Sequence, residues 1–457
     1  MPFYPNWDSL SRYTVPQWFQ DAKLGIFVHW GVYSVPAFGN EWYPRNMYRE
    51  GTPEFAHHRE TWGPQDRFGY KDFIPLFTGA RFDPEGWVDL FREAGARYIV
   101  PVGEHHDGFP MFASAFTPWN AANLGPCRDV VAEVARATRE AGMKVGVSSH
   151  RAFNWRYYTF GRGMDTDRPE NVRLYGRPHA EGLPADARFL ADWFGRVKEL
   201  IDRFDPDVLW FDFGWHEPEF DPYRPQVLAY YYNRAEERGY EPVLQYKDKL
   251  PDGVAVFDME RGKLADIRPI PWQTDTSVSY KSWGYVADDE FKSVTTLVHD
   301  LVDIVSKNGN LLLNVGPAPD GTIPEEAQAR LRGLGRWLRV NGEAIYGTRP
   351  WERFGEGSTP VVVGHLTEQQ NVPFTAEDIR FTTRPGALYA TLLGWPKGEA
   401  WVRSLGTASS VAGRIRQVTL LGDGRPLAFR QEADGLHVAL PERCSGEHAW
   451  VLKVALA

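Results

Sequence analysis

Residues 208–215 read VLWFDFGW, an apolar run in which a single carboxylate, Asp212, stands between two phenylalanines. A near-continuous apolar run of this length is typical of a parallel strand that is buried on both faces. A carboxylate in such a run costs free energy unless its charge is paired or used. The stretch therefore raises two questions: which sheet contains this strand, and what Asp212 does at its end.

Seven other apolar runs share this character, which makes eight predicted strands. Amphipathic helical patterns lie between several of them, but the gaps between the fifth and sixth runs and between the sixth and seventh are too short for a helix. This order predicts an α/β fold, an irregular TIM-like (β/α)8 barrel over residues 1–345. The strands are 24–30, 98–106, 144–150, 208–215, 242–247, 254–261, 270–278 and 310–317, and the helices are 129–142, 188–204, 290–309 and 324–342.

The pattern changes after residue 345. Short strand-like runs follow one another, separated by turn sequences and with no helical period between them. This predicts a C-terminal antiparallel β-sandwich over residues 346–457, which we expect to support the barrel without contributing to a site. We expect residues 360–366, PVVVGHL, to form one of its strands, and residues 347–358 to be a connector.

Composition excludes several classes of protein. The 457 residues carry a formal net charge of −9 with no run of lysine and arginine, which argues against a nucleic-acid partner. No segment approaches the ~18 apolar residues of a membrane span. Cys127 and Cys444 are the only cysteines, too few for a disulfide framework, and they fit a reducing compartment. The first residues do not resemble a secretory signal, so we expect a cytoplasmic protein, although a leader removed from the natural chain stays open.

Polar side chains stand at the ends of seven of the predicted strands. Because chemistry in such barrels takes place at the carboxyl ends of the strands, these residues predict a site at one mouth of the barrel, with Asp212 as a functional carboxylate. They are His29 and Trp30; Glu104, His105, His106 and Asp107; Ser149 and His150; Asp212; Lys247 and Asp248; Glu260 and Arg261; Gln273 and Asp275.

The residue types at this mouth narrow the chemistry. No glycine-rich dinucleotide or phosphate loop follows a strand, and no GxSxG elbow is present, so we expect no cofactor. Two carboxylates on different strands, Asp212 and Glu260, suit glycoside hydrolysis by double displacement. The adjacent pair His105 and His106 suggests a metal-dependent barrel hydrolase instead. Neighbouring strand residues point to opposite faces, however, so both can bind one metal only where the chain bends.

Five stretches together carry a resemblance. In order along the chain they are KLGIFVHWGVYSVPAFGNEWYPRNMY (23–48), EHHDGF (104–109), LWFDFGW (209–215), SWGY (282–285) and NGNLLLNVGPAPDGTIP (308–324). This ordered set resembles the α-L-fucosidases of glycoside hydrolase family 29 across almost the whole barrel. The resemblance implies a retaining exo-glycosidase that removes terminal α-L-fucose from fucosylated oligosaccharides or glycoconjugates, without a metal.

The resemblance also implies roles. Asp212 matches the family nucleophile, and we place the acid/base at Glu260. The residues implied to line the fucose pocket are His29, Glu41, Trp42, His105, His106, Trp210, Lys247 and Trp283. Three positions depart from the pattern of many relatives: Glu104 stands where a lysine is common, Lys247 where some have arginine, and Gln273 where many have glutamate.

Each of these residues also has a structural interpretation. Asp212 could be a buried carboxylate bonded to backbone donors, Glu260 could pair with a neighbouring base, and the histidines could belong to the core. Glu41 could pair with Arg45 one helical turn on. A non-catalytic fucose-binding relative is a third function class. The sequence leaves linkage preference, the leaving group, oligomeric state and the role of Glu104 open.

Overall fold

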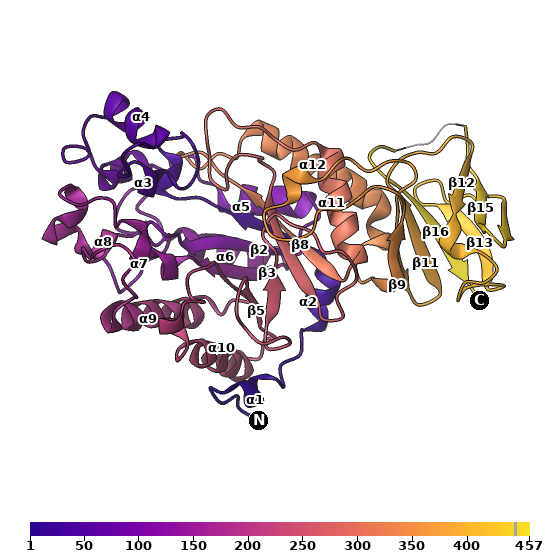
Figure 1. Ribbon diagram of the computed structural model, residues 1–457, viewed down its shortest axis with the longest axis horizontal. Coiled ribbons are helices and arrows are strands. Elements are labelled where there is room, and N and C mark those ends of the chain that lie inside the picture. The colour runs from indigo at the N-terminus through magenta and orange to yellow at the C-terminus, as the bar shows by residue number, and fades with distance from the viewer. Residues whose placement is uncertain (443–445) are drawn as a thin grey trace.

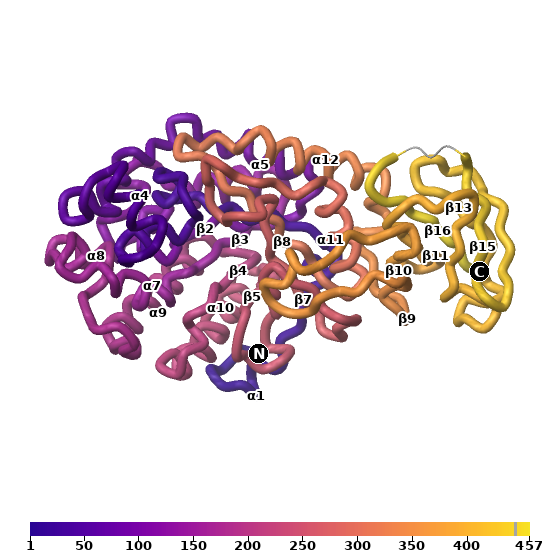
Figure 2. The backbone as a smooth tube through the Cα atoms, turned by 45° about the horizontal axis from the view of Figure 1, so that its top comes forward, coloured from indigo at the N-terminus to yellow at the C-terminus, as the bar shows by residue number. Residues whose placement is uncertain are grey.

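The computed structural model describes residues 1–442 and 446–457. A barrel surrounded by helices forms the larger part, and a smaller β-domain, yellow in Figure 1, lies against the side that carries α11 and α12. The turned view in Figure 2 shows the same arrangement, with α4 at the far end from the β-domain. Within the described residues, the structure has no helix that is long and apolar enough to cross a lipid bilayer.

Eight parallel strands close the barrel in sequence order, and β8 pairs with β1 to complete it. All eight predicted strands are present, each one to four residues shorter than its apolar run at one or both ends, so the predicted fold class is confirmed. The strands are β1 Leu24–Val28, β2 Tyr98–Glu104, β3 Lys144–Ser149, β4 Val208–Phe211, β5 Val243–Tyr246, β6 Val256–Asp258, β7 Trp272–Ser277 and β8 Gly309–Val315.

Helices cover the outside of the barrel except between β5 and β6 and between β6 and β7, as the spacing predicted. Several begin at a side-chain cap: the Asp186 carboxylate, for example, accepts a hydrogen bond from the backbone N–H of Phe189 at the start of α9. The longer helices are α4 Pro53–Thr61, α5 Pro84–Glu93, α6 Val130–Glu140, α9 Ala187–Phe204, α10 Arg224–Arg238, α11 Val294–Ser306 and α12 Glu325–Asn341. The short ones are α1 Trp7–Leu10, α2 Gln17–Ala22, α3 Tyr43–Asn46, α7 Asn154–Tyr157 and α8 Val172–Tyr175.

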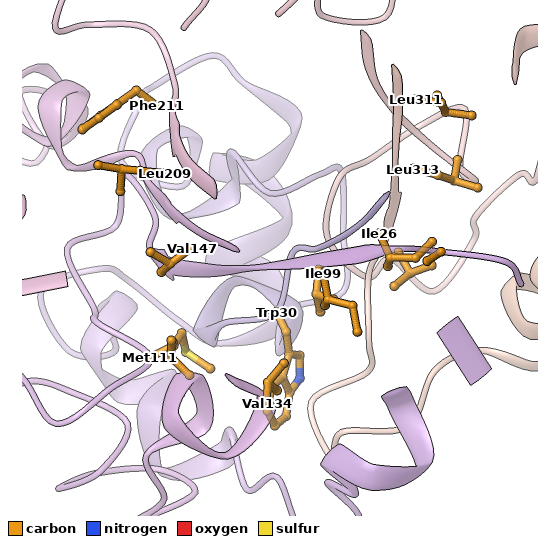
Figure 3. Close-up of a cluster of buried hydrophobic side chains, with 14 of the residues drawn as sticks. Ile26, Trp30, Ile99, Met111, Val134, Val147, Leu209, Phe211, Leu311 and Leu313 are labelled. Carbon is orange, nitrogen blue, oxygen red and sulfur yellow. The ribbon is translucent and has the colours of Figure 1, made fainter. Parts of the chain in front are cut away.

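Alternate residues of β4 belong to two different cores. Leu209 and Phe211 point outward into the cluster between strands and helices, where Figure 3 shows them with Ile99 and Val134. Val208 and Trp210 belong to the cluster inside the barrel. Since strand side chains alternate between faces, the next residue of the inner set after Trp210 is Asp212. The alternation of β4 therefore directs this carboxylate to the inner mouth of the barrel.

The β-domain consists of two antiparallel sheets around its own apolar core, in agreement with the predicted sandwich. The five-stranded sheet has the order β13-β16-β11-β10-β9, and the three-stranded sheet has the order β12-β15-β14. The strands are β9 Arg349–Glu356, β10 Ile379–Arg384, β11 Ala387–Leu392, β12 Glu399–Val402, β13 Ile415–Leu420, β14 Phe429–Glu432, β15 Gly435–Ala439 and β16 Trp450–Leu456. The division of the chain at residue 345 stays a prediction.

Two local predictions for the C-terminal domain were wrong. Residues 347–358 are not a plain connector, because they contain β9, the edge strand of the larger sheet. Residues 360–366 form no strand of the sandwich. Their backbone bonds instead to the barrel loop after β6: the N–H of Gly364 donates to the carbonyl of Lys263, and the N–H of Leu366 donates to the carbonyl of Glu260. These partners satisfy backbone groups that a strand would have bonded in a sheet.

Cys127 has a free thiol and lies at the surface. Cys444 lies outside the described residues.

Candidate active site

A cavity of about 800 Å³ opens at the carboxyl ends of the barrel strands. All ten residues that the resemblance assigned to the site line it, although they come from stretches more than 250 residues apart. Their placement agrees with the predicted mouth, and their individual roles stay predictions. They are His29, Glu41, Trp42, His105, His106, Trp210, Asp212, Lys247, Glu260 and Trp283. Of the other strand-end residues, five do not line the cavity: Trp30, Glu104, Asp107, Ser149 and Gln273.

Asp212 lies at the centre of this group, directly after β4. Its Oδ2 atom lies 3.0 Å from Nε2 of His106 and 3.1 Å from Nδ1 of His150, and its Oδ1 atom lies 3.0 Å from Nζ of Lys247. Burial acts to raise the pKa of Asp212, but Lys247 and the two histidines outweigh it and hold that pKa well below its ordinary value. The buried carboxylate is therefore ionised.

The two histidines that contact Asp212, His106 and His150, differ in what their second ring nitrogen contacts. Burial lowers the pKa of His150 to about 4, so its ring is neutral at pH 7. Its Nδ1–H donates to Asp212, and its Nε2 accepts from the hydroxyl of Ser148 at 2.8 Å. His106 faces two acceptors, the backbone carbonyl of His150 at Nδ1 (2.7 Å) and Asp212 at Nε2. Both ring nitrogens of His106 therefore face oxygen atoms, and the ring is held in place by Asp212 and the backbone of His150.

Lys247, at the end of β5, joins the two catalytic candidates. Its ammonium nitrogen lies 3.0 Å from Asp212 Oδ1, 2.6 Å from Glu260 Oε2 and 3.6 Å from Asp275 Oδ2. Burial acts to lower the pKa of Lys247, but these carboxylates raise it well above its ordinary value. The same nitrogen lies 4.8 Å from the ring centroid of Trp210. One buried cation therefore bridges Asp212, directly after β4, and Glu260, two residues after β6.

Glu41 holds one wall of the cavity. Its Oε2 accepts hydrogen bonds from the hydroxyl of Ser282 (3.0 Å) and from the backbone N–H of Trp283 (2.9 Å). Burial raises the pKa of Glu41. Arg45, which the sequence offered as an alternative partner, lies instead over the ring of Phe160, 4.7 Å from its centroid. Glu41 thus fixes the loop that carries Trp283.

Histidines and aromatic rings complete the pocket. Nδ1 of His29 lies 2.7 Å from the amide oxygen of Asn314, which can only accept, so the proton of His29 is on Nδ1 and Nε2 is left as an acceptor. Burial lowers the pKa values of His29 and His105 well below the ordinary value, so both rings are neutral. Trp42 stacks on Phe213 with centroids 6.0 Å apart. Neutral imidazoles beside flat aromatic faces are suited to a sugar ring, which offers both hydroxyls and C–H groups.

Sequence reasoning assigned no role to His150 and left the role of Glu104 undecided. His150 had been noted at a strand end but received no role, because no local pattern reveals a contact with Asp212, 62 residues away. The alternation of β3 was a usable signal, since Gly146 and Ser148 precede His150 at every second position. Glu104 does not line the cavity. It is buried between Arg151 (3.1 Å) and Arg196 (3.3 Å), which makes it structural.

The predicted C-terminal domain, residues 346–457, also reaches the cavity, contrary to the expectation that it serves only as support. His365 and Leu366, which precede the sandwich strands β10–β16, line the cavity beside Glu260. No sequence signal marked them, because the apolar run 360–366 resembles an ordinary strand.

Among the described residues, two sets of side chains at the cavity have ligand atoms close enough to hold a metal ion: His29, His105 and His150, and His106, His150 and Asp212. Both sets share His150, whose two ring nitrogens are already occupied by Asp212 and Ser148. A metal at either set would have to displace one of these hydrogen bonds. A third, largely exposed set in the β-domain is Glu432, Asp434 and His437.

Comparisons with known proteins agree with the family resemblance and with the fold. A family model described as "Alpha-L-fucosidase" matches residues 1–343, and one described as "Alpha-L-fucosidase C-terminal domain" matches residues 370–455. Tissue alpha-L-fucosidase of Rattus norvegicus is 33% identical over 469 residues, which cover 99% of this chain and 92% of the rat protein. Plasma alpha-L-fucosidase of Homo sapiens is 33% identical over 455 residues, covering 96% and 89%. The crystal structure of Thermotoga maritima alpha-fucosidase in complex with fucose matches with a TM-score of 0.79 and 33% identity, covering 99% of this chain and 100% of that one.

Proposed function

Because this chain belongs to the alpha-L-fucosidase family, we propose that it hydrolyses terminal α-L-fucose from fucosylated glycans by double displacement, with Asp212 as the nucleophile and Glu260 as the general acid and base. The activity follows from the family. The two residue roles are our proposal for this chain.

The bridge through Lys247 carries the proposal. Because Lys247 Nζ lies 3.0 Å from Asp212 and 2.6 Å from Glu260, the two carboxylate oxygens can be no farther apart than the sum of these distances. That limit allows the ~5–5.5 Å spacing of retaining glycosidases and is below the ~6.5–9.5 Å that inverting enzymes need to fit a water molecule. The geometry therefore favours a retaining mechanism with this pair.

In the first step, an oxygen of ionised Asp212 attacks the anomeric carbon of fucose and the glycosidic C–O bond breaks. Glu260 gives its proton to the leaving oxygen, and a fucosyl ester of Asp212 forms. In the second step, Glu260 takes a proton from water, the water oxygen attacks the same carbon, and Asp212 leaves as a carboxylate. Two inversions give overall retention. The contacts of Asp212 with His106, His150 and Lys247 keep it ionised for the attack.

The pocket residues have a complementary role in this proposal. The free Nε2 of His29 accepts a hydrogen bond from a sugar hydroxyl. His106 and Lys247 donate to sugar or ester oxygens as Asp212 changes charge. Trp283, held by Glu41, offers its ring to the apolar side of fucose. These contacts fix the anomeric carbon in line with Asp212.

The test is Asp212→Gly. Loss of the nucleophile should lower kcat by more than ~10³-fold, or about 4 kcal/mol. Azide should restore part of the activity and give a fucosyl azide of inverted configuration, because it enters the space that the carboxylate leaves. A variant that keeps a tenth of the wild-type activity would remove Asp212 from the role.

The histidine sets leave a second candidate, a metal-dependent hydrolysis. Activity that survives prolonged dialysis against a chelator excludes it, whereas activity that is lost and then restored by zinc would favour it. Turnover of an aryl fucoside by the wild-type protein separates both from a non-catalytic fucose-binding protein.

A further inference from the structure

The chain between β9 and β10 of the β-domain returns to the active site. Three backbone hydrogen bonds tie residues 364–368 to the loop after β6: Gly364 N–H to the Lys263 carbonyl (3.1 Å), Leu366 N–H to the Glu260 carbonyl (2.8 Å) and Glu368 N–H to the Arg261 carbonyl (3.0 Å). We call residues 364–368 the return segment. It packs against the loop that carries Glu260.

One side chain of the return segment bonds to Glu260 itself. The backbone N–H of Glu260 donates to Nδ1 of His365 at 3.2 Å. An imidazole nitrogen accepts only when it carries no proton, so His365 is neutral here and its proton is on Nε2. The contact fixes the backbone at Glu260 and leaves an N–H donor on the outer side of the ring.

Ion pairs of Glu368 anchor the C-terminal end of the return segment. The carboxylate of Glu368 is largely buried and lies 2.7 Å from both Arg261 Nη1 and Lys292 Nζ. The guanidinium of Arg261 in turn lies over the ring of Trp283, 4.6 Å from its centroid. The segment is therefore tied both to the acid/base loop and to the fucose-side wall, so it forms a fixed part of the cavity.

The outer end of the segment is open to a ligand. His365 and Leu366 both line the cavity, and Leu366 is 63% exposed, so its side chain is accessible to a ligand there. A general acid lies beside the oxygen of the leaving group. His365 bonds to the backbone of Glu260 and lines the same cavity, so it lies on the leaving-group side of the cavity as well.

We infer that His365 and Leu366 form the wall that contacts the leaving group, and that His365 is also a positioning residue for Glu260. The wall offers an apolar surface and one N–H donor, which suits a glycosyl leaving group with a C–H face and ring or hydroxyl oxygens. The inference rests on the proposed role of Glu260.

The experiment compares two substrates and one inhibitor. The substrates are a fucosyl disaccharide and an aryl fucoside with an acidic phenol, and the inhibitor is L-fucose, which occupies only the fucose pocket. His365→Ala should lower kcat/KM for the disaccharide about tenfold, the size of one lost hydrogen bond, and for the aryl fucoside less than about twofold. Inhibition by fucose should stay unchanged.

Three further variants separate positioning from contact. His365→Asn keeps an acceptor near the Nδ1 position and should recover kcat for the disaccharide while KM stays raised. Leu366→Ala should raise KM for the disaccharide without a change in kcat. Val363→Ala, exposed on the neighbouring stretch and outside the cavity lining, is the matched control and should behave as wild type.

Equal losses on both substrates, weaker inhibition by fucose, or unchanged disaccharide kinetics in His365→Ala would overturn the inference. Glu260→Ala is measured in parallel. If it shows the dependence on the leaving group and His365→Ala does not, the inference alone fails. If Glu260→Ala lacks that dependence, the assigned acid/base is wrong and the positioning role is overturned with it.

Discussion

Lys247 and Glu260 form a direct ion pair inside the cavity, with Nζ 2.6 Å from Oε2. A general acid has to hold a proton before it donates one, whereas a carboxylate in an ion pair is in the form that accepts a proton. The pair therefore matches the state that the second step needs, in which Glu260 is a base. In the first step, the leaving oxygen has to replace Lys247 as the partner of the Glu260 carboxyl group. Lys247 then keeps its contact with Asp212.

Removal of this cation should change the pH profile. Lys247→Met keeps the length of the side chain without its charge. Because Lys247 helps to hold the pKa of Asp212 well below its ordinary value, its loss raises that pKa. The nucleophile must be ionised, so the acid limb of kcat/KM should move to higher pH.

Lys247→Arg is the control for this change, because it keeps the charge and should keep the acid limb close to that of the wild type. The measurement is kcat/KM for an aryl fucoside across the acid limb. An acid limb that stays in place in Lys247→Met would show that the two histidines alone depress the pKa of Asp212.

His150 provides a second test of the same carboxylate. His150→Ala removes a hydrogen bond to a charged group, which is worth about 1.5–3 kcal/mol. We expect kcat to fall about 10–100-fold. His150→Asn, which retains an N–H donor on a shorter side chain, should recover part of it. Loss of bound zinc together with activity in His150→Ala would instead favour the metal-dependent candidate.

His29 and His105 should act mainly in recognition. Each alanine variant leaves a sugar hydroxyl without its partner in a buried pocket, at a cost of about 1–3 kcal/mol. We therefore expect a lower kcat/KM and weaker inhibition by a fucose-shaped iminosugar. A variant with full inhibitor affinity and a reduced kcat would assign that histidine to the chemical step instead.

The sequence was sufficient for the barrel and for much of the site, for a physical reason. Strands buried on both faces produce apolar runs, and a carboxylate such as Asp212 in a run of this kind is a local signal. Glu260 had no comparable signal, since an acidic residue beside Arg261 is common, and it was placed by resemblance. His150 and His365 act through contacts between residues far apart in the chain, which no local pattern encodes. The run 360–366 was misread because its partner is a barrel loop and not a sheet.

The interface between barrel and sandwich should depend on Asp303 of α11. This buried carboxylate lies 2.8 Å from Lys307 Nζ and 2.6 Å from Nε of Arg380 in β10. Removing it leaves two buried cations without their partner, so Asp303→Asn should destabilise the fold by about 3–5 kcal/mol. Thermal unfolding near pH 7 measures this, with Asp288→Asn at the surface as the control.

The contacts of Asp303 with Lys307 and Arg380 also predict that its contribution to the stability of the fold depends on pH. Burial acts to raise the pKa of Asp303, but Lys307 and Arg380 outweigh it and hold the pKa below its ordinary value. A depressed pKa contributes stability above the unfolded value of ~3.9 that is lost as the pH falls through the folded value. The gap between wild type and Asp303→Asn should therefore narrow in acid. A constant gap would mean that packing and not charge decides the effect.

The final prediction concerns Glu260. Glu260→Ala should cripple the hydrolysis of sugar-linked fucosides, because their leaving alcohols need a proton. The first step should slow much less for an aryl fucoside with an acidic phenol. The second step then lacks its base, so the fucosyl ester of Asp212 should accumulate. Azide should speed its breakdown and give a fucosyl azide of retained configuration, which separates this variant from Asp212→Gly.

The structure supplies the control for Glu260. Glu41 lines the same cavity but is bonded to Ser282 and to the backbone of Trp283. Glu41→Gln should therefore slow sugar-linked and aryl fucosides by similar factors, since it disturbs the wall of the fucose pocket and not proton transfer. If Glu260→Ala slows both substrates equally while Glu41→Gln spares the aryl fucoside, the acid/base is Glu41. The bridge through Lys247 then serves only to hold the nucleophile.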